Sequence, residues 1–252
     1  MSGAPLEVEL KFAVRDADAL EALLDADRVA GLVAGPWRVV DVVDRYVDTA
    51  EGAIAYGGYA ARLRTTAGIT TLDLKSLADV PSADESGHGR PTAAGGAIRR
   101  RRELNGPAGD ELDPAAWPQS EARALLLELA GDAPLAERFT LRQRRRERDL
   151  RGPQGWAVLS LDDVVVEHAG AVLGELAALE VEMRGGDEGM LHDVAAVLEQ
   201  SGAVGGAPVS KLEAAEMLLA AEAGPLTPPH EEPPEEPTPP PAPRLEVGTS
   251  PG

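Results

Sequence analysis

The segment LEVELKF, residues 6–12, alternates strictly between apolar and ionisable side chains. Successive side chains of a β-strand point to opposite faces, so Glu7, Glu9 and Lys11 share one face and the apolar residues share the other. A strand with one face in a core and the other in water is the commonest origin of this pattern. The chain must therefore begin with a strand that has one ionisable face.

The same alternation recurs in seven further segments, which we predict to be strands. They cover residues 42–52, 59–66, 70–77, 97–105, 139–150, 155–167 and 178–183. Helical patterns lie between and after them, at residues 16–26, 120–131, 187–202 and 210–222. Ser120 is a typical N-terminal cap for the second helix, and Gly131 is a typical stop.

About eight strands with one ionisable face would leave a very large face of mixed charge if they formed an open sheet. Closing the sheet into a barrel removes this problem, because the charged faces then line a water-filled lumen and the helices cover the apolar faces outside. The predicted fold class is therefore α+β, with an antiparallel eight-stranded barrel or tunnel and helices packed outside.

A lumen lined by both signs of charge predicts a ligand that satisfies both. Crowded arginines and lysines repel one another and favour a polyanion, whereas carboxylates beside a polyanion require a divalent cation. A phosphate chain with Mg²⁺ or Mn²⁺ meets both conditions. On this interpretation Glu7 and Glu9 hold the metal and Lys11 holds phosphate.

Composition excludes several classes of function. The net charge of −19 argues against general binding of nucleic acid, which requires a basic surface. The chain has no cysteine, so thiolate catalysis and cysteine-bound zinc are excluded. It also has no apolar run of membrane-spanning length and no leader pattern at Met1, so a soluble cytoplasmic protein is expected.

The last 32 residues differ from the rest in composition. Residues 221–252 contain eleven of the 21 prolines and six glutamates, with one arginine. Such a segment cannot bury an apolar face, so we predict a disordered tail or linker after a single domain that covers residues 1–220.

Taken in order, these motifs resemble the CYTH domain of the triphosphate tunnel metalloenzymes, the group that includes CyaB-like and thiamine triphosphatase-like proteins. The resemblance covers about residues 5 to 220. It rests on the ExExK signature at Glu7, Glu9 and Lys11, and on a series of later motifs. These are the arginine pair Arg62 and Arg64, Lys75, the RxE element Arg101 and Glu103, an arginine-rich strand over 142–146, an aspartate in LDD, the ExE pair Glu180 and Glu182, and Lys211. All three lysines of the chain fall on motif positions.

The resemblance implies an antiparallel tunnel, a triphosphate substrate and Mg²⁺ or Mn²⁺. It implies catalytic roles for Lys11, Glu7 and Glu9. Phosphate binding is implied for Arg62, Arg64, Lys75, Arg101, Arg142, Arg144 and Lys211. Metal binding is implied for Glu7, Glu9, Asp162, Glu180, Glu182 and Glu103. In relatives, a linker like this tail often leads to a CHAD domain.

Two positions remain open at this stage. Arg142, Arg144 and Arg146 are in phase on one strand, and Arg144 is favoured as the phosphate contact, with Arg142 next. Asp162 is preferred to Asp163 because Leu159 and Leu161 should face the apolar side.

The predicted activity is metal-dependent hydrolysis of triphosphates, with inorganic triphosphate as the favoured substrate. The alternatives are a class IV adenylate cyclase, a thiamine triphosphatase and a polyphosphate-binding module without turnover. The chain has few aromatic residues that could stack on an organic group, whereas pure phosphate binding does not require so many carboxylates.

Overall fold

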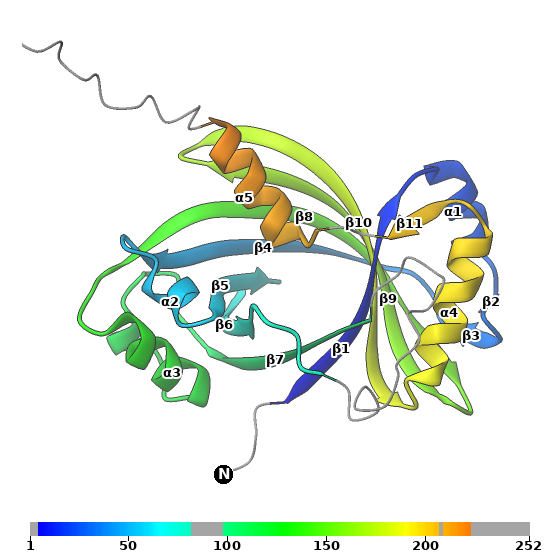
Figure 1. The fold of residues 1–252 in the computed structure, drawn as a ribbon, viewed down its shortest axis with the longest axis horizontal. Coiled ribbons are helices and arrows are strands. Elements are labelled where there is room, and N and C mark those ends of the chain that lie inside the picture. The colour runs from blue at the N-terminus through cyan, green and yellow to red at the C-terminus, as the bar shows by residue number, and fades with distance from the viewer. Residues whose placement is uncertain (1–4, 82–97, 207–208, 223–252) are drawn as a thin grey trace, which may run out of the picture.

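The computed structural model describes residues 5–81, 98–206 and 209–222, and these residues form a closed antiparallel β-barrel (Figure 1). The strands follow one another in the order β8-β4-β5-β6-β7-β1-β10-β9, and β9 pairs with β8 to close the ring. They are β1 (Leu6–Val14), β4 (Arg38–Thr49), β5 (Tyr59–Thr66), β6 (Ile69–Ser76), β7 (Ile98–Pro107), β8 (Leu135–Gly152), β9 (Gly155–His168) and β10 (Ala171–Gly186). The predicted fold class is confirmed.

The register of β1 decides what meets inside the barrel. On one side Glu9 lies opposite Glu182 and Lys11 opposite Glu180 of β10. On the other side Glu7 lies opposite Arg101 of β7. The two acidic motifs, far apart in sequence, are therefore neighbours across one strand pair.

Helices cover the apolar outer faces on two sides. The side chains of Leu63 and Leu72 from β5 and β6 pack with Leu126 of α3 (Glu121–Ala130) and Ile54 of α2 (Ala53–Tyr56). The hydroxyl of Ser120 accepts a hydrogen bond from the backbone N–H of Arg123, which confirms the predicted cap.

On the other side, α1 (Ala17–Leu24) and α4 (Gly189–Gln200) pack against a larger apolar cluster (Figure 1). The cluster includes Leu10 of β1, Leu159 of β9 and Val181 of β10. The short strands β2 (Arg28–Val29), β3 (Leu32–Ala34) and β11 (Val204–Gly206) extend the sheet beside it, and a 3₁₀ turn, η2, covers Pro114–Ala116. These short elements have no alternating pattern long enough to predict them.

The last helix, α5 (Lys211–Glu222), closes one end of the barrel. Its fully buried Ala215 packs with Tyr46, Phe139 and Val164, side chains that the barrel strands direct inward. The lumen is therefore apolar at the α5 end and charged beyond it, whereas the sequence predicted a charged lumen throughout.

The helix α5 ends at Glu222, and the prediction for the rest of residues 221–252 lies outside the described residues. Within the described part of the chain, no helix combines the length and the apolar character needed to span a membrane.

Candidate functional site: a charged lumen

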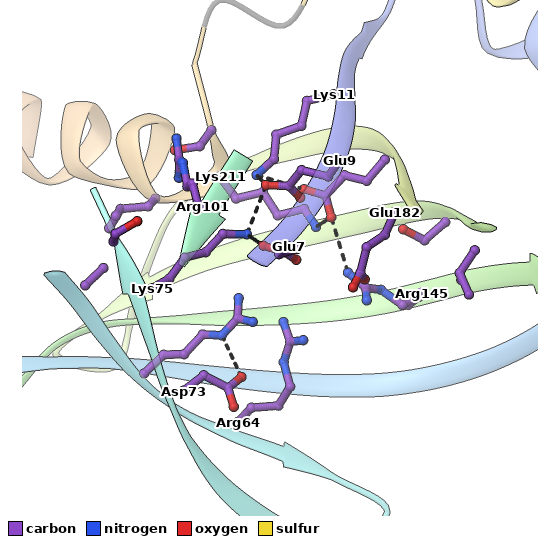
Figure 2. A pocket seen from close by; sticks show the side chains of 18 of the residues that line it. Glu7, Glu9, Lys11, Arg64, Asp73, Lys75, Arg101, Arg145, Glu182 and Lys211 are labelled. Carbon is purple, nitrogen blue, oxygen red and sulfur yellow. Dashed lines mark hydrogen bonds and ion pairs between the residues drawn. The ribbon is translucent and has the colours of Figure 1, made fainter. Parts of the chain in front are cut away.

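The barrel lumen holds a cavity whose charged lining comes from six of its strands and from α5. Its cationic lining residues are Lys11, Arg62, Arg64, Lys75, Arg101, Arg145, Arg184 and Lys211. Its acidic lining residues are Glu7, Glu9, Asp73, Glu147, Glu180 and Glu182. Most of the side chains chosen from the sequence motifs thus converge in one space (Figure 2).

Each of the three lysines bridges two carboxylates. Lys11 lies 3.2 Å from Glu9 and 3.4 Å from Glu180. Lys75 donates to Glu9 at 2.9 Å and also pairs with Glu7. Lys211 donates to Glu180 at 3.0 Å, so a continuous chain of ion pairs links β6, β1, β10 and α5. Figure 2 shows Lys11 and Lys75 reaching one shared carboxylate, that of Glu9, from opposite sides.

These contacts shift the protonation of the glutamates that they engage. Burial alone raises the pKa of Glu180, but the charges of Lys211, Lys11 and Arg145 outweigh it and hold that pKa well below its usual range. The pKa of Glu7 is lowered in the same way, because Lys75 outweighs the effect of burial. Both groups are carboxylates at neutral pH.

Two further glutamates have the opposite shift. Burial raises the pKa of Glu182 to about 7, and Glu7, Glu103 and Glu9 add to this rise although Arg184 opposes it. Burial likewise raises the pKa of Glu103 to about 7, despite the charge of Arg62. Where Glu7, Glu9, Glu103 and Glu182 meet, the carboxylates exceed the positive charge available to them.

The lumen arginines have aspartates as partners. Arg64 makes two hydrogen bonds of 2.7 Å to Asp44, and Arg62 donates to Asp73 at 3.1 Å. Asp44 is 1% exposed and also accepts from Gln143 at 2.7 Å. The guanidinium groups are therefore held in fixed orientations before any ligand arrives.

The arginine that β8 directs into the lumen is Arg145. The sequence favoured Arg144, with Arg142 next, as the lumen arginine of this strand, and that prediction is wrong. Arg144 and Arg142 line a separate depression formed with Asp41 and Asp163, and Arg142 pairs with Glu167. Arg146 pairs with Glu21 of α1.

The cause is the phase of β8. Phe139 and Leu141 point into the barrel toward Tyr46 and α5, so Gln143 and Arg145 follow them on the inner face. Leu150 joins the outer cluster around α1 and α4, so the apolar residues of this strand change face along its length. That change of parity from odd to even residue numbers is the signal that sequence reasoning overlooked.

Asp162, and not Asp163, belongs to the lumen network, in agreement with the stated preference. Asp162 is completely buried and accepts two hydrogen bonds from Arg145, at 2.7 and 2.9 Å. It also pairs with Lys211. Asp163 is exposed and lies beside Arg144 in the outer depression.

The lining residues Glu147, Ser160 and Arg184 belong to none of the sequence motifs named above. The sequence does contain a signal for Arg184: Glu180, Glu182 and Arg184 alternate, so they share one face of β10. Arg184 pairs with Glu182 at 2.8 Å.

The donor set suits a hard divalent cation, since Mg²⁺ and Mn²⁺ prefer carboxylate oxygens. The carboxylates that exceed their cationic partners are the residues available to such an ion. The Oε2 atom of Glu7 is buried, and its partner is the ammonium group of Lys75. Among the described residues, no acidic or histidine side chains are grouped so that they could hold an ion as they stand. The lysines must move away from the glutamates before an ion can be held there.

The model of the CYTH domain family matches residues 5–215. The chain belongs to the CYTH domain family. The match includes every motif residue named above, and Lys211 is the last of them. No sequence among the curated proteins matches the chain significantly.

Solved structures with the same fold share little sequence with this CYTH chain. One is the Hippeastrum protein HpAC1, an adenylyl cyclase candidate described as having a dominant triphosphatase activity. It is 19% identical with a TM-score of 0.58, and the match covers 84% of this chain and 95% of that one. Another is an adenylate cyclase candidate from Bacillus halodurans, 17% identical with a TM-score of 0.52, with 84% and 98% covered. At these identities the likeness supports the fold alone.

Proposed function

We propose that this CYTH protein is a divalent-metal-dependent hydrolase of triphosphates, with inorganic triphosphate as its substrate and Mg²⁺ or Mn²⁺ as its cofactor. We further propose that it acts in the cytoplasm on a small molecule and not on nucleic acid. The observation that supports the activity is the meeting of lysines, arginines and two acidic motifs in one lumen. Isolated phosphate binding needs the cations but not the surplus of carboxylates.

The cations bind the phosphate oxygens in this proposal. Arg62 and Arg64 come from β5, and Lys75 comes from the neighbouring strand β6. Arg101, Arg145 and Lys211 come from β7, β8 and α5. Lys11 lies in the middle of the ion-pair chain, between Glu9 and Glu180. In this proposal it would lie nearest the bond to be broken. Its charge would stabilise negative charge that develops on the transferred phosphoryl group.

The carboxylates Glu7, Glu9, Glu180 and Glu182 would hold the metal, and Glu103 would either join them or orient Arg62. A bound divalent ion supplies charge neutralisation on the phosphates and lowers the pKa of an attacking water. When the ligand binds, the lysine side chains would change partners. They would leave the glutamates for phosphate oxygens, and the glutamates would then be free to bind the ion.

An adenylate cyclase needs a surface that holds adenine. Among the described residues that line the lumen, Tyr46 is the aromatic one, and its ring is stacked on Phe139 with centroids 4.8 Å apart. This arrangement favours a substrate without a large aromatic group over ATP or thiamine triphosphate.

The direct test is phosphate release from tripolyphosphate, ATP and thiamine triphosphate, each with Mg²⁺ and with Mn²⁺, while cyclic AMP is assayed in the same samples. We expect the fastest release from tripolyphosphate and none without metal. Glu9→Gln and Glu182→Gln should each lose most of this activity and remain folded. Formation of cyclic AMP would identify a cyclase, and tight binding of tripolyphosphate without turnover under any condition would identify a binding module.

A further inference from the structure

The acidic residues that contact the lumen cations fall into two groups according to the cation that each one pairs with. Glutamates pair with lysines: Glu7 and Glu9 with Lys75, Glu9 and Glu180 with Lys11, and Glu180 with Lys211. Aspartates pair mainly with arginines, although Asp162 also pairs with Lys211, and Arg145 lies 3.5 Å from Glu180. The pairs are Asp44 with Arg64, Asp73 with Arg62, Asp79 with Arg101, and Asp162 with Arg145.

The geometry of the four arginine pairs is uniform. In each pair the arginine donates its Nε to the aspartate, at 2.7 Å for Arg64 and Arg145, 3.1 Å for Arg62 and 3.3 Å for Arg101. A guanidinium that is held through Nε keeps terminal N–H groups for a second acceptor, since the fork has five donors. The fifth lumen arginine, Arg184, differs, because it pairs through Nη1 with Glu182.

Two of these aspartates, Asp44 and Asp162, are poorly placed to bind an ion. Asp44 and Asp162 are 1% and 0% exposed, and the two oxygens of each are occupied by arginine nitrogens. Freeing them for a metal would leave a buried guanidinium unpaired, which is strongly unfavourable. The lysine–glutamate pairs can separate more easily, because each lysine carries a compact charge on a flexible side chain that can turn to another partner.

We propose that Asp44, Asp73, Asp79 and Asp162 are positioning residues that hold the phosphate-binding arginines, and that metal binding belongs to the lumen glutamates alone. This inference rests on the proposed function and replaces the metal role that the sequence suggested for Asp162. In it, ligand binding separates lysines from glutamates but leaves every arginine–aspartate pair intact.

The test compares Asp162→Asn with its neighbour Asp163→Asn, which changes the same residue type on the exposed outer face. Mn²⁺ is first titrated into each protein without phosphate, and free Mn²⁺ is followed by electron paramagnetic resonance. We expect Asp162→Asn and Asp163→Asn to bind Mn²⁺ like the wild type, whereas Glu9→Gln should lose affinity about tenfold or more.

Kinetics then separate positioning from metal binding. For tripolyphosphate at saturating Mn²⁺, Asp162→Asn should raise KM about tenfold or more with a smaller effect on kcat, because a displaced arginine weakens the hold on phosphate. Asp73→Asn should behave alike, and Asp73→Glu should restore part of the affinity. Asp163→Asn should match the wild type.

Loss of Mn²⁺ affinity in folded Asp162→Asn, comparable with that in Glu9→Gln, would overturn the inference. So would a wild-type KM in Asp73→Asn.

If Asp162→Asn does not fold, Asp73→Asn and Asp79→Asn carry the test, with Glu188→Gln as the control for Asp79. Glu188 pairs with Arg100, which neighbours Arg101 on β7 but faces away from the lumen. If the wild type shows no turnover, the proposed function fails, and the Mn²⁺ titration with direct binding of tripolyphosphate still decides the roles of the aspartates.

Discussion

At the scale of residues, the choice between lysine and arginine follows what each cation must do in the lumen. The three lysines of the chain all contact lumen glutamates, although arginine is otherwise the basic residue of this sequence. An ammonium group can transfer from a carboxylate to a phosphate by a small rotation, whereas a guanidinium held by two hydrogen bonds cannot. The rare lysines therefore mark the positions where partners change.

The first prediction concerns the difference between two of these lysines. Lys11→Ala should lower kcat by about 10²–10³ and change KM less, because Lys11 lies where charge would build up in the transition state. Lys75→Ala should instead raise KM, since it would bind phosphate that is already charged in the ground state. Steady-state kinetics with tripolyphosphate measure both. Lys11→Arg should recover only part of the rate, and a reversal of the two patterns would contradict the assigned roles.

The second prediction uses the buried carboxylate of Asp44. Burial raises its pKa, but Arg62, Arg64 and Gln143 outweigh that effect and lower the pKa below the ordinary value. A lowered native pKa stabilises the folded state at pH values above the unfolded pKa of about 3.9, and this contribution is lost as the pH falls through the native value. Asp44→Asn should cost about 3–5 kcal/mol at pH 7, because it leaves a buried arginine without its charge partner.

Urea unfolding of both proteins between pH 7 and pH 3 or below checks this prediction. The gap in free energy of unfolding between wild type and Asp44→Asn should shrink at the acid end of the range. A gap that stays constant with pH would show that the carboxylate charge is not what stabilises this part of the lumen.

At the scale of elements, the sequence predicts the inner face of a strand only where its apolar residues stay on one side. In β1 and β10 they do, and Glu9, Lys11, Glu180 and Glu182 were placed correctly in the lumen. In β8 they do not, because the start of the strand turns its apolar residues toward α5 and its end turns them toward the outer cluster. The change of face is visible in the apolar residues of β8, but the packing of α5 decides which half of the strand turns them inward, and the sequence of β8 does not give the position of α5.

The third prediction concerns α5 itself. Ala215 is fully buried where α5 meets the barrel, and Met217 on the same helix is 63% exposed. Ala215→Asp should place a charge among apolar side chains, release the helix and lower the melting temperature by several degrees. Met217→Asp, which puts the same charged side chain at an exposed position of the same helix, should change it little. Circular dichroism melts compare the two, and equal melting temperatures would mean that α5 does not stabilise the barrel by packing.

At the scale of the whole molecule, a strongly acidic chain concentrates its cations inside. The net charge is −19, yet the lumen presents eight lysines and arginines to a ligand. Every residue with a proposed role lies at or before Lys211.

The fourth prediction follows: removal of residues 223–252 should leave both tripolyphosphate hydrolysis and the melting temperature unchanged within error. A large loss of either would show that the acidic segment contacts the barrel.

The last prediction treats metal and phosphate as one combined ligand. Tripolyphosphate alone would draw lysines away and leave the glutamates unpaired, and metal alone would leave the lysines unpaired, so each should bind weakly without the other. Together they replace all the broken ion pairs.

At about 100 times the dissociation constant of the combined ligand, the folded state gains about 2.7 kcal/mol, which corresponds to a rise in melting temperature of roughly 5–10 °C for a domain of this size. Differential scanning calorimetry with Mg²⁺, with tripolyphosphate and with both measures this gain. The combined shift should exceed the sum of the separate shifts in the wild type and in Glu188→Gln, but not in Glu9→Gln. Additive shifts in the wild type would mean that the two ligands bind independently, and the exchange of lysine partners would then not link them.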